Sequence, residues 1–152
     1  MIVTNNKWVY LKTLNLGLNK FGDEGLKCLL TANWPQLEDL DIQSTGITIE
    51  GIEILVAKSN WSHLKKLNLS RNSIKDEDMD LLSRGKWPKL ESLDLYGTQI
   101  TKNGVKILIN TSSNWLNMKS LALTMNVISY DEVRYFSKTT WPHFYSLITR
   151  GA

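Results

Sequence analysis

Apolar residues recur along this chain with a period of 26 to 28 residues. Each unit opens on a tryptophan, an apolar residue follows three positions later, and a leucine follows three positions after that. The tryptophans are Trp8, Trp34, Trp61, Trp87, Trp115 and Trp141, so the units start near these residues, with a partial unit from 141. A fixed period of this length predicts a solenoid of stacked units.

The spacing of apolar residues changes within each unit. Pairs at i and i+2, such as Leu67 and Leu69, form the buried face of a short strand. Later apolar residues, such as Ile52, Leu55 and Val56, follow the i, i+3, i+4 spacing of one helix face. The pattern therefore predicts strands beginning near residues 13, 39, 66, 92, 120 and 146, each followed by a helix.

Polar residues mark where the helices should begin. Thr48, Thr101 and Ser129 suit the N-cap position, and Ser129 with Glu132 forms a capping box. In the third unit the equivalent residue is a lysine, which is a poor cap. We expect Asp76 to replace it and to shift that helix start by one residue.

The repeated segments carry a family resemblance. LKTLNLGLNKF, LEDLDIQSTGI, LKKLNLSRNSI and LESLDLYGTQI match the pattern L-x-x-L-x-L-x-x-N-x-L, with Thr for Asn in two of them. Over about residues 8–149 the chain resembles leucine-rich-repeat proteins, and the unit length is similar to their ribonuclease-inhibitor-like class. The resemblance implies an α/β fold in a single domain over residues 1–152. Its parallel β-sheet would lie on the concave face and its helices on the convex face, and the crossover rule makes the solenoid right-handed.

Strictly repeated positions are predicted to be structural. The row Asn19, Thr45, Asn72, Thr98 and Asn126 resembles the family's polar ladder, which bonds backbone groups at the strand ends. The tryptophans should stack in the turns, with Trp8 and Trp141 as exceptions because each lies in an end unit. The shared helix position of Gly25, Gly51 and Gly104 indicates close packing between units. Cys28 lies beside two leucines and is expected in the core.

Composition changes this interpretation little. A net charge of +3 with 22% charged residues indicates neither nucleic acid nor membrane as a partner. No apolar run suits a signal peptide or a membrane span. A single cysteine excludes an intrachain disulfide and favours a reducing compartment, so we expect a cytoplasmic location, or delivery into a host cytoplasm.

Catalytic chemistry has no sequence signature here. No Ser-His-Asp or Cys-His arrangement, phosphate-binding glycine loop or metal-ligand spacing occurs, and the acidic run 76–80 lacks the Gly and Glu of an EF-hand. We predict no cofactor, no metal and no enzyme activity. A GTPase-activating role would need an arginine finger, for which Arg71, Arg84, Arg134 and Arg150 are the candidates.

The irregular positions carry the functional hypothesis. Residues between the strand leucines point away from the core, onto the concave sheet face. In the second to fourth units they differ most, with charges of both signs and one aromatic ring. The predicted partner-binding residues are Asp39, Asp41, Lys66, Arg71, Asp94 and Tyr96. Tyrosine and arginine are enriched at interface hot spots.

The resemblance implies a protein–protein interaction module whose partner the sequence does not identify. The alternative is a structural spacer or assembly segment of a larger repeat protein, such as a substrate-recognition or effector protein. Leu11, Leu14 and Leu147 would have one open flank, so we also expect a longer array or end-to-end self-association.

Overall fold

The computed structural model describes residues 8–59 and 61–149. In this part of the chain, strands and helices alternate along the sequence. The strands are β1 (Thr13–Asn15), β2 (Asp39–Asp41), β3 (Lys66–Asn68), β4 (Ser92–Asp94), β5 (Ser120–Ala122) and β6 (Ser146–Ile148). The helices are α1 (Gly22–Leu29), α2 (Ile49–Lys58), α3 (Asp78–Ser83), α4 (Lys102–Asn110) and α5 (Tyr130–Val133), with 3-10 turns η1 (Ser112–Asn114) and η2 (Arg134–Lys138).

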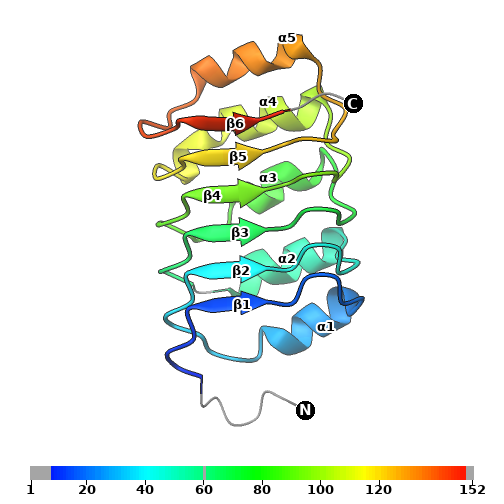
Figure 1. Ribbon diagram of the computed structural model, residues 1–152, viewed down its shortest axis with the longest axis vertical. Coiled ribbons are helices and arrows are strands. Elements are labelled where there is room, and N and C mark those ends of the chain that lie inside the picture. Colours follow the sequence, from blue (N-terminus) through cyan, green and yellow to red (C-terminus); the bar gives the residue numbers. More distant parts are fainter. Residues whose placement is uncertain (1–7, 60, 150–152) are drawn as a thin grey trace.

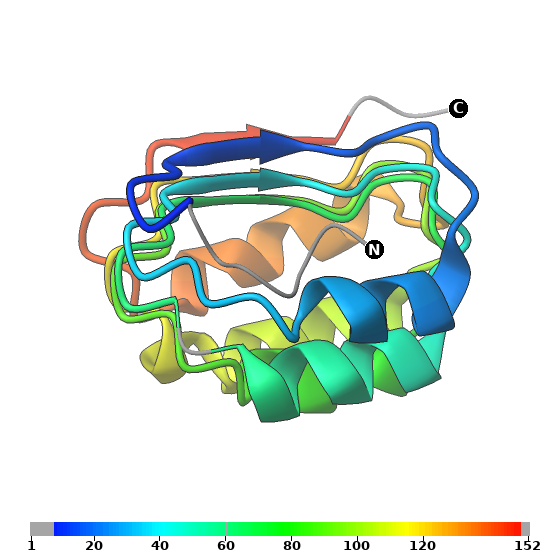
Figure 2. The same cartoon turned by 90° about the horizontal axis from the view of Figure 1, so that it is seen from below.

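The six strands form one parallel sheet in the order β1-β2-β3-β4-β5-β6 (Figure 1). Every strand begins at the predicted residue, and equivalent positions pair in register, such as Leu40 with Leu67 and Leu67 with Leu93. Helices cover one face of the sheet. Figure 2 looks along the array and shows β1 and β6 raised above the middle strands, so the open face is concave. The predicted α/β solenoid with its sheet on the concave side is confirmed.

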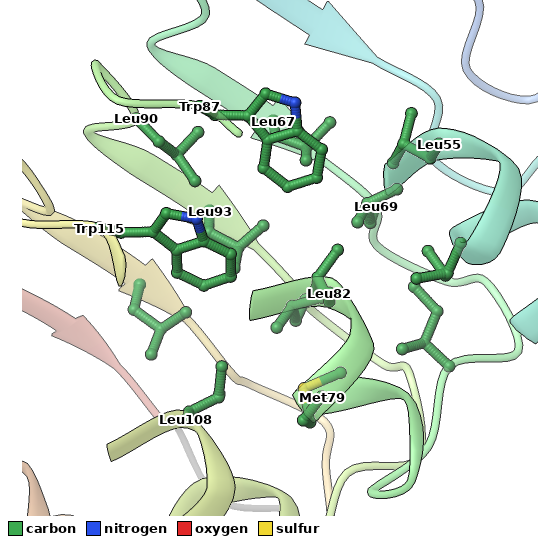
Figure 3. Close-up of a cluster of buried hydrophobic side chains, with 14 of the residues drawn as sticks. Leu55, Leu67, Leu69, Met79, Leu82, Trp87, Leu90, Leu93, Leu108 and Trp115 are labelled. Atoms are coloured by element: carbon green, nitrogen blue, oxygen red, sulfur yellow. The ribbon is translucent and has the colours of Figure 1, made fainter. Parts of the chain in front are cut away.

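The core lies between the sheet and the helices. The middle residue of each of β2 to β5 is buried, and leucines from strands and helices meet in this layer (Figure 3). Trp87 and Trp115 stack with ring centroids 6.3 Å apart, as expected of a structural row. Trp8 is 50% exposed, but Trp141 is buried, contrary to the expectation for an end unit. Phe144 covers it at a centroid distance of 5.0 Å.

Cys28 is exposed, so its predicted place in the core is wrong. The buried residue of α1 is Leu26. A residue two positions further along a helix lies about 200° around its axis, on the opposite side. Helix geometry therefore turns the thiol toward solvent, while Leu29 and Leu30 only partly enter the core.

The polar ladder joins neighbouring units. The side-chain oxygen of Asn72 accepts hydrogen bonds from the backbone N–H groups of Thr45, Gly46 and Ile47 in the preceding unit. Its amide group donates to the carbonyl oxygens of Ile42 and Leu69. Asn126 repeats this arrangement two units later. The ladder prediction is confirmed, and buried backbone groups in these turns depend on one asparagine per pair of units.

Helix starts show the same two-unit alternation. Thr48 and Thr101 cap α2 and α4 as predicted. Asp23 and Asp76 each lie one unit earlier and accept hydrogen bonds from the backbone N–H and the hydroxyl of these threonines. Asp76 is therefore engaged by the next unit and does not cap α3, which begins at Asp78. This corrects the predicted one-residue shift.

At the helix starts of the third and fifth units, the backbone N–H instead donates to a carboxylate of the same unit. Asp78 accepts from the backbone N–H of Lys75 at 2.8 Å, and Glu132 accepts from that of Ser129 at the same distance. The predicted capping box of α5 is thus present. Gly51 and Gly104 leave room for Asp23 and Asp76, so these glycines do reflect close packing between units, whereas a Cβ at Gly25 would instead meet Phe21 of its own unit.

Candidate binding face

The open side of the sheet presents three columns of side chains, which we call the sheet face. The first column is Thr13, Asp39, Lys66, Ser92, Ser120 and Ser146. The second is Asn15, Asp41, Asn68, Asp94, Ala122 and Ile148, and the third is Gly17, Gln43, Ser70, Tyr96 and Thr124, with Arg71 just beyond. Residues of the first two columns are exposed or half-buried, in contrast to the buried leucines between them on β2 to β5. Ser70 is buried and does not contribute accessible surface.

The second column also shapes the strand ends. The side-chain oxygens of Asn15, Asp41, Asn68 and Asp94 each accept a hydrogen bond from the backbone N–H two residues later. This is the Asx-turn arrangement of short polar side chains. Two of the predicted partner-binding residues, Asp41 and Asp94, therefore also hold the chain in place as it leaves the strand.

The negative charge of Asp41 acts on Asp94 across the middle of the face. Register places Asn68 between them on β3. Burial raises the pKa of the Asp94 carboxyl, the backbone N–H of Tyr96 opposes that rise, and the negative charge of Asp41 adds to it. Asp41 in turn accepts from the Gln43 amide at 3.2 Å. The centre of the sheet face thus carries two acids without an ion-pair partner in the described part of the chain.

Basic and acidic residues alternate where the chain enters the strands. Glu38 lies between Lys12 and Lys65, at nitrogen–oxygen distances of 3.0 and 2.6 Å. The hydrogen bond from Lys65 and then that from Lys12 lower the pKa of Glu38 to about 2. Two units later, Glu91 pairs with Lys119 at 3.0 Å. This row borders the sheet face, and each of its charged side chains has a partner of opposite charge within the row.

Opposite charges on the first column also meet. Lys66 and Asp39 occupy paired positions on β3 and β2, and their charged atoms lie 3.8 Å apart. Both side chains are more than a third exposed, so the pair is weak and open to exchange for a partner's charge.

Arg71 and Tyr96 contact each other on the face through both their ring and their polar atoms. The guanidinium carbon of Arg71 lies 5.1 Å from the centroid of the Tyr96 ring, and Nη2 lies 3.5 Å from the phenol oxygen. Arg71 has a φ of 54°, in the left-handed region, and its backbone N–H donates to the carbonyl of Tyr96 at 2.7 Å. The backbone thereby aims the guanidinium across the neighbouring unit.

The structure brings the predicted residues together in pairs. Asp39 contacts Lys66, Arg71 stacks on Tyr96, and Asp94 accepts from the backbone N–H of Tyr96. Gly97 and Met125, which flank the Arg71–Tyr96 pair, were missed. Their signal is that the residue before each ladder Asn or Thr varies freely between units: Leu18, Ser44, Arg71, Gly97 and Met125.

The described residues hold no group of three or more His, Cys, Asp or Glu side chains placed to bind a metal ion. Nor does any helix within residues 8–59 and 61–149 have the length and apolar character to cross a membrane. The sheet face presents charged side chains, amides and one aromatic ring, which are groups suited to recognition.

Comparison with known proteins places this architecture in context. A leucine-rich-repeat family model matches residues 9–30 and 62–83. The human NACHT, LRR and PYD domains-containing protein 13 is 31% identical over 141 residues, which is 88% of this chain. The chain spans only 14% of the length of that relative.

Solved structures of two other proteins have a similar fold. An internalin from Listeria monocytogenes is 26% identical with a TM-score of 0.60, covering 92% of this chain and 35% of the internalin. A Bacteroides fragilis protein, 19% identical with a TM-score of 0.61, covers 93% of this chain and 42% of that protein and shows the same fold.

Proposed function

This chain is a leucine-rich-repeat protein, and we propose that it binds a protein partner on its sheet face. Repeats of this kind generally serve as protein-interaction modules. The observation that carries the proposal is the contrast between repeated and irregular positions. Repeated side chains are buried or bonded between units, whereas those of the sheet face change in charge and size from unit to unit.

The middle of the array best suits recognition. Asp39, Asp41 and Asp94 are half-buried, Lys66 and Arg71 are exposed, and Tyr96 is held by its contact with Arg71. Charges of both signs can steer and orient a partner, and a preordered aromatic ring loses little entropy on binding. Hot spots lie near the centre of an interface, which here falls on β3 and β4.

Two other functions are less well supported. A spacer or assembly segment of a larger repeat protein needs no distinctive sheet face. A GTPase-activating role would use one of the four candidate arginines. Arg84 is paired with Asp80, Arg71 and Arg134 lie over the rings of Tyr96 and Tyr135, and Arg150 lies outside the described residues. We favour binding, because the irregular sheet face supports it directly, and we propose the cytoplasm, or the cytoplasm of a host, as the place of action.

The test is a comparison of captured proteins. The wild-type chain, a Tyr96→Ala variant and a Lys106→Glu variant would each be used to capture proteins from a lysate of the source or its host. Lys106 is an exposed residue of α4 on the helical side. We expect one protein to be retained by wild type and Lys106→Glu and lost by Tyr96→Ala. Retention that depends on Lys106 but not on Tyr96 would place the interaction on the helices, and no specific retention would favour the spacer.

A further inference from the structure

We propose, building on the assignment of the sheet face as the binding surface, that Arg71, Tyr96, Gly97 and Met125 form a subsite for an acidic side chain followed by an apolar one. The ligand class is an extended protein segment with Asp or Glu at one position and an apolar residue two positions later.

The part of the subsite that would bind the acidic side chain is the Arg71 guanidinium. The other cation of the sheet face, Lys66, has a carboxylate 3.8 Å away, but no described carboxylate is ion-paired with Arg71. The guanidinium lies over the Tyr96 ring, and its side-chain hydrogen bond in the described part of the chain joins Nη2 to the Tyr96 phenol oxygen, so further N–H donors remain for a ligand. An arginine ordered in this way loses little rotamer entropy when its donors meet a carboxylate, and such charge-assisted pairs are the stronger hydrogen bonds of proteins.

Backbone groups near the subsite are already satisfied. The N–H of Tyr96 donates to Asp94, that of Gly97 donates to Thr124, and that of Arg71 donates to Tyr96. Recognition here therefore falls to side chains, and to the arginine in particular.

The apolar half is a notch over Gly97. Every other complete unit has a side chain at this position, namely Leu18, Ser44, Arg71 or Met125. A Cβ at Gly97 would lie 3.6 Å from the Cγ of Arg71 and 3.9 Å from the Cβ of Met125, which is ordinary van der Waals contact. Because Gly97 has no side chain, a partner's methyl or methylene group resting over its Cα would lie between the arginine stem and the methionine. Met125 is 55% exposed and would be covered by it.

The spacing selects an extended ligand. Arg71 and Met125 belong to units two strands apart, or about 10 Å across the sheet, with Gly97 midway. In an extended chain, residues at i and i+2 lie on one side, about 7 Å apart. A segment crossing the strands can therefore place a carboxylate near the Arg71 guanidinium and an apolar side chain over Gly97, against Met125.

The experiment uses pools of nine-residue peptides with random flanks and a fixed centre: Glu-x-Leu, Gln-x-Leu or Glu-x-Ser. Each pool is passed over the immobilised full chain, as wild type, Arg71→Gln or the matched Lys66→Gln. Wild type should retain the Glu-x-Leu pool about tenfold more than the Gln-x-Leu pool, as expected for a charge-assisted pair. Arg71→Gln should abolish that difference and Lys66→Gln should preserve it.

A second variant tests the notch. Gly97 has a φ of 59°, a conformation that asparagine tolerates, so Gly97→Asn fills the space without forbidding the backbone. It should reduce the preference for Glu-x-Leu over Glu-x-Ser. Thermal unfolding of Arg71→Gln and Gly97→Asn by circular dichroism separates loss of binding from loss of fold.

Equal retention of the Glu and Gln pools by wild type, including no retention of either, would overturn the subsite. If a natural partner nevertheless requires Tyr96 and not Lys106, the sheet face remains the binding surface and only its acidic preference is wrong. If Arg71 selects the Glu pool but the natural partner depends on Lys106, the subsite stands and the general function fails.

Discussion

Asn72 and Asn68 lie four residues apart in the same unit, yet they belong to two regions with different roles. Asn72 is buried in the ladder and bonds backbone groups of two units. Asn68 is half-buried on the sheet face and accepts from one backbone N–H of its own turn. The ladder links units and is the same in alternate units, whereas the face carries residues that differ. We therefore expect stability to concentrate in the ladder, and we propose that recognition takes place on the face.

The largest loss of stability is expected from removing an asparagine of the ladder. Asn72→Ala should lower the free energy of unfolding by roughly 3–5 kcal/mol, because it leaves several buried backbone groups without partners. Asn68→Ala is the matched control and should cost only about 1 kcal/mol. Urea denaturation followed by circular dichroism measures both. Equal losses would mean that the ladder and the face do not differ in this way.

A smaller loss should follow from filling the space between units. A Cβ at Gly104 would lie 2.5 Å from Asp76 Oδ1 and 2.7 Å from Ile100 Cγ2. Gly104→Ala should therefore destabilise by about 1–2 kcal/mol, although alanine is the better helix former. In a background of Asp76→Ala the same change should cost less, since one of the clashing atoms is absent. A double-mutant cycle measures that coupling, and strict additivity would rule out the contact.

Acid should weaken the charged row that borders the face. Glu38 has a pKa lowered to about 2 from an ordinary value of 4.5. Its contribution to stability is complete above pH 4.5 and is lost as the pH falls toward 2. Lys65→Gln should move the pKa of Glu38 back toward its ordinary value, because Lys65 is the largest cause of the shift. NMR titration of the Glu38 carboxyl tests this, and an unchanged pKa would exclude Lys65 as the cause.

The smallest effect on stability is expected at Asp94. Its pKa is raised in the folded chain, so its ionisation opposes folding: the favourable contribution is present below pH 3.8 and is lost as the pH rises through the folded pKa. An asparagine at this position would keep the acceptor for the Tyr96 N–H. Asp94→Asn should thus leave stability at neutral pH unchanged or up to about 0.5 kcal/mol higher. Marked destabilisation in chemical denaturation would show that the carboxylate charge itself supports the fold.

Strand positions could be predicted from the sequence because the repeat specifies them locally. Each strand needs one buried leucine between two outward residues, and six copies in register fix where the strands begin. Caps at Thr48, Thr101 and Ser129 were predictable for the same reason, since they depend on neighbours within one turn.

Contacts between units could not be predicted in the same way. Asp76 is a good cap by residue type, but Thr101, 25 residues later, engages its carboxylate. Trp141 donates its indole N–H to the carbonyl oxygen of Ser112 in the preceding unit, a contact that the repeat pattern does not specify. The exposure of Cys28, in contrast, was available from helix geometry, because it lies two residues beyond the buried Leu26.

The candidate site was predicted as a set of residues but not as a set of contacts. Alternation along each strand places Asp39, Lys66 and Asp94 on the open face. The contact between Arg71 and Tyr96 joins side chains 25 residues apart in neighbouring units, which the alternation within one strand does not specify. The turn-forming role of the second column had a signal, since its first four members are all Asn or Asp.

The most direct test of partner binding on the sheet face is the affinity of a captured partner for Tyr96→Ala and Lys106→Glu, measured by calorimetry against wild type. Tyr96→Ala should weaken binding by about 2 kcal/mol, or roughly thirtyfold in Kd, while thermal unfolding stays close to wild type. Lys106→Glu should bind as wild type does. Normal binding by Tyr96→Ala together with loss of binding by Lys106→Glu would contradict the account and place the site on the helices.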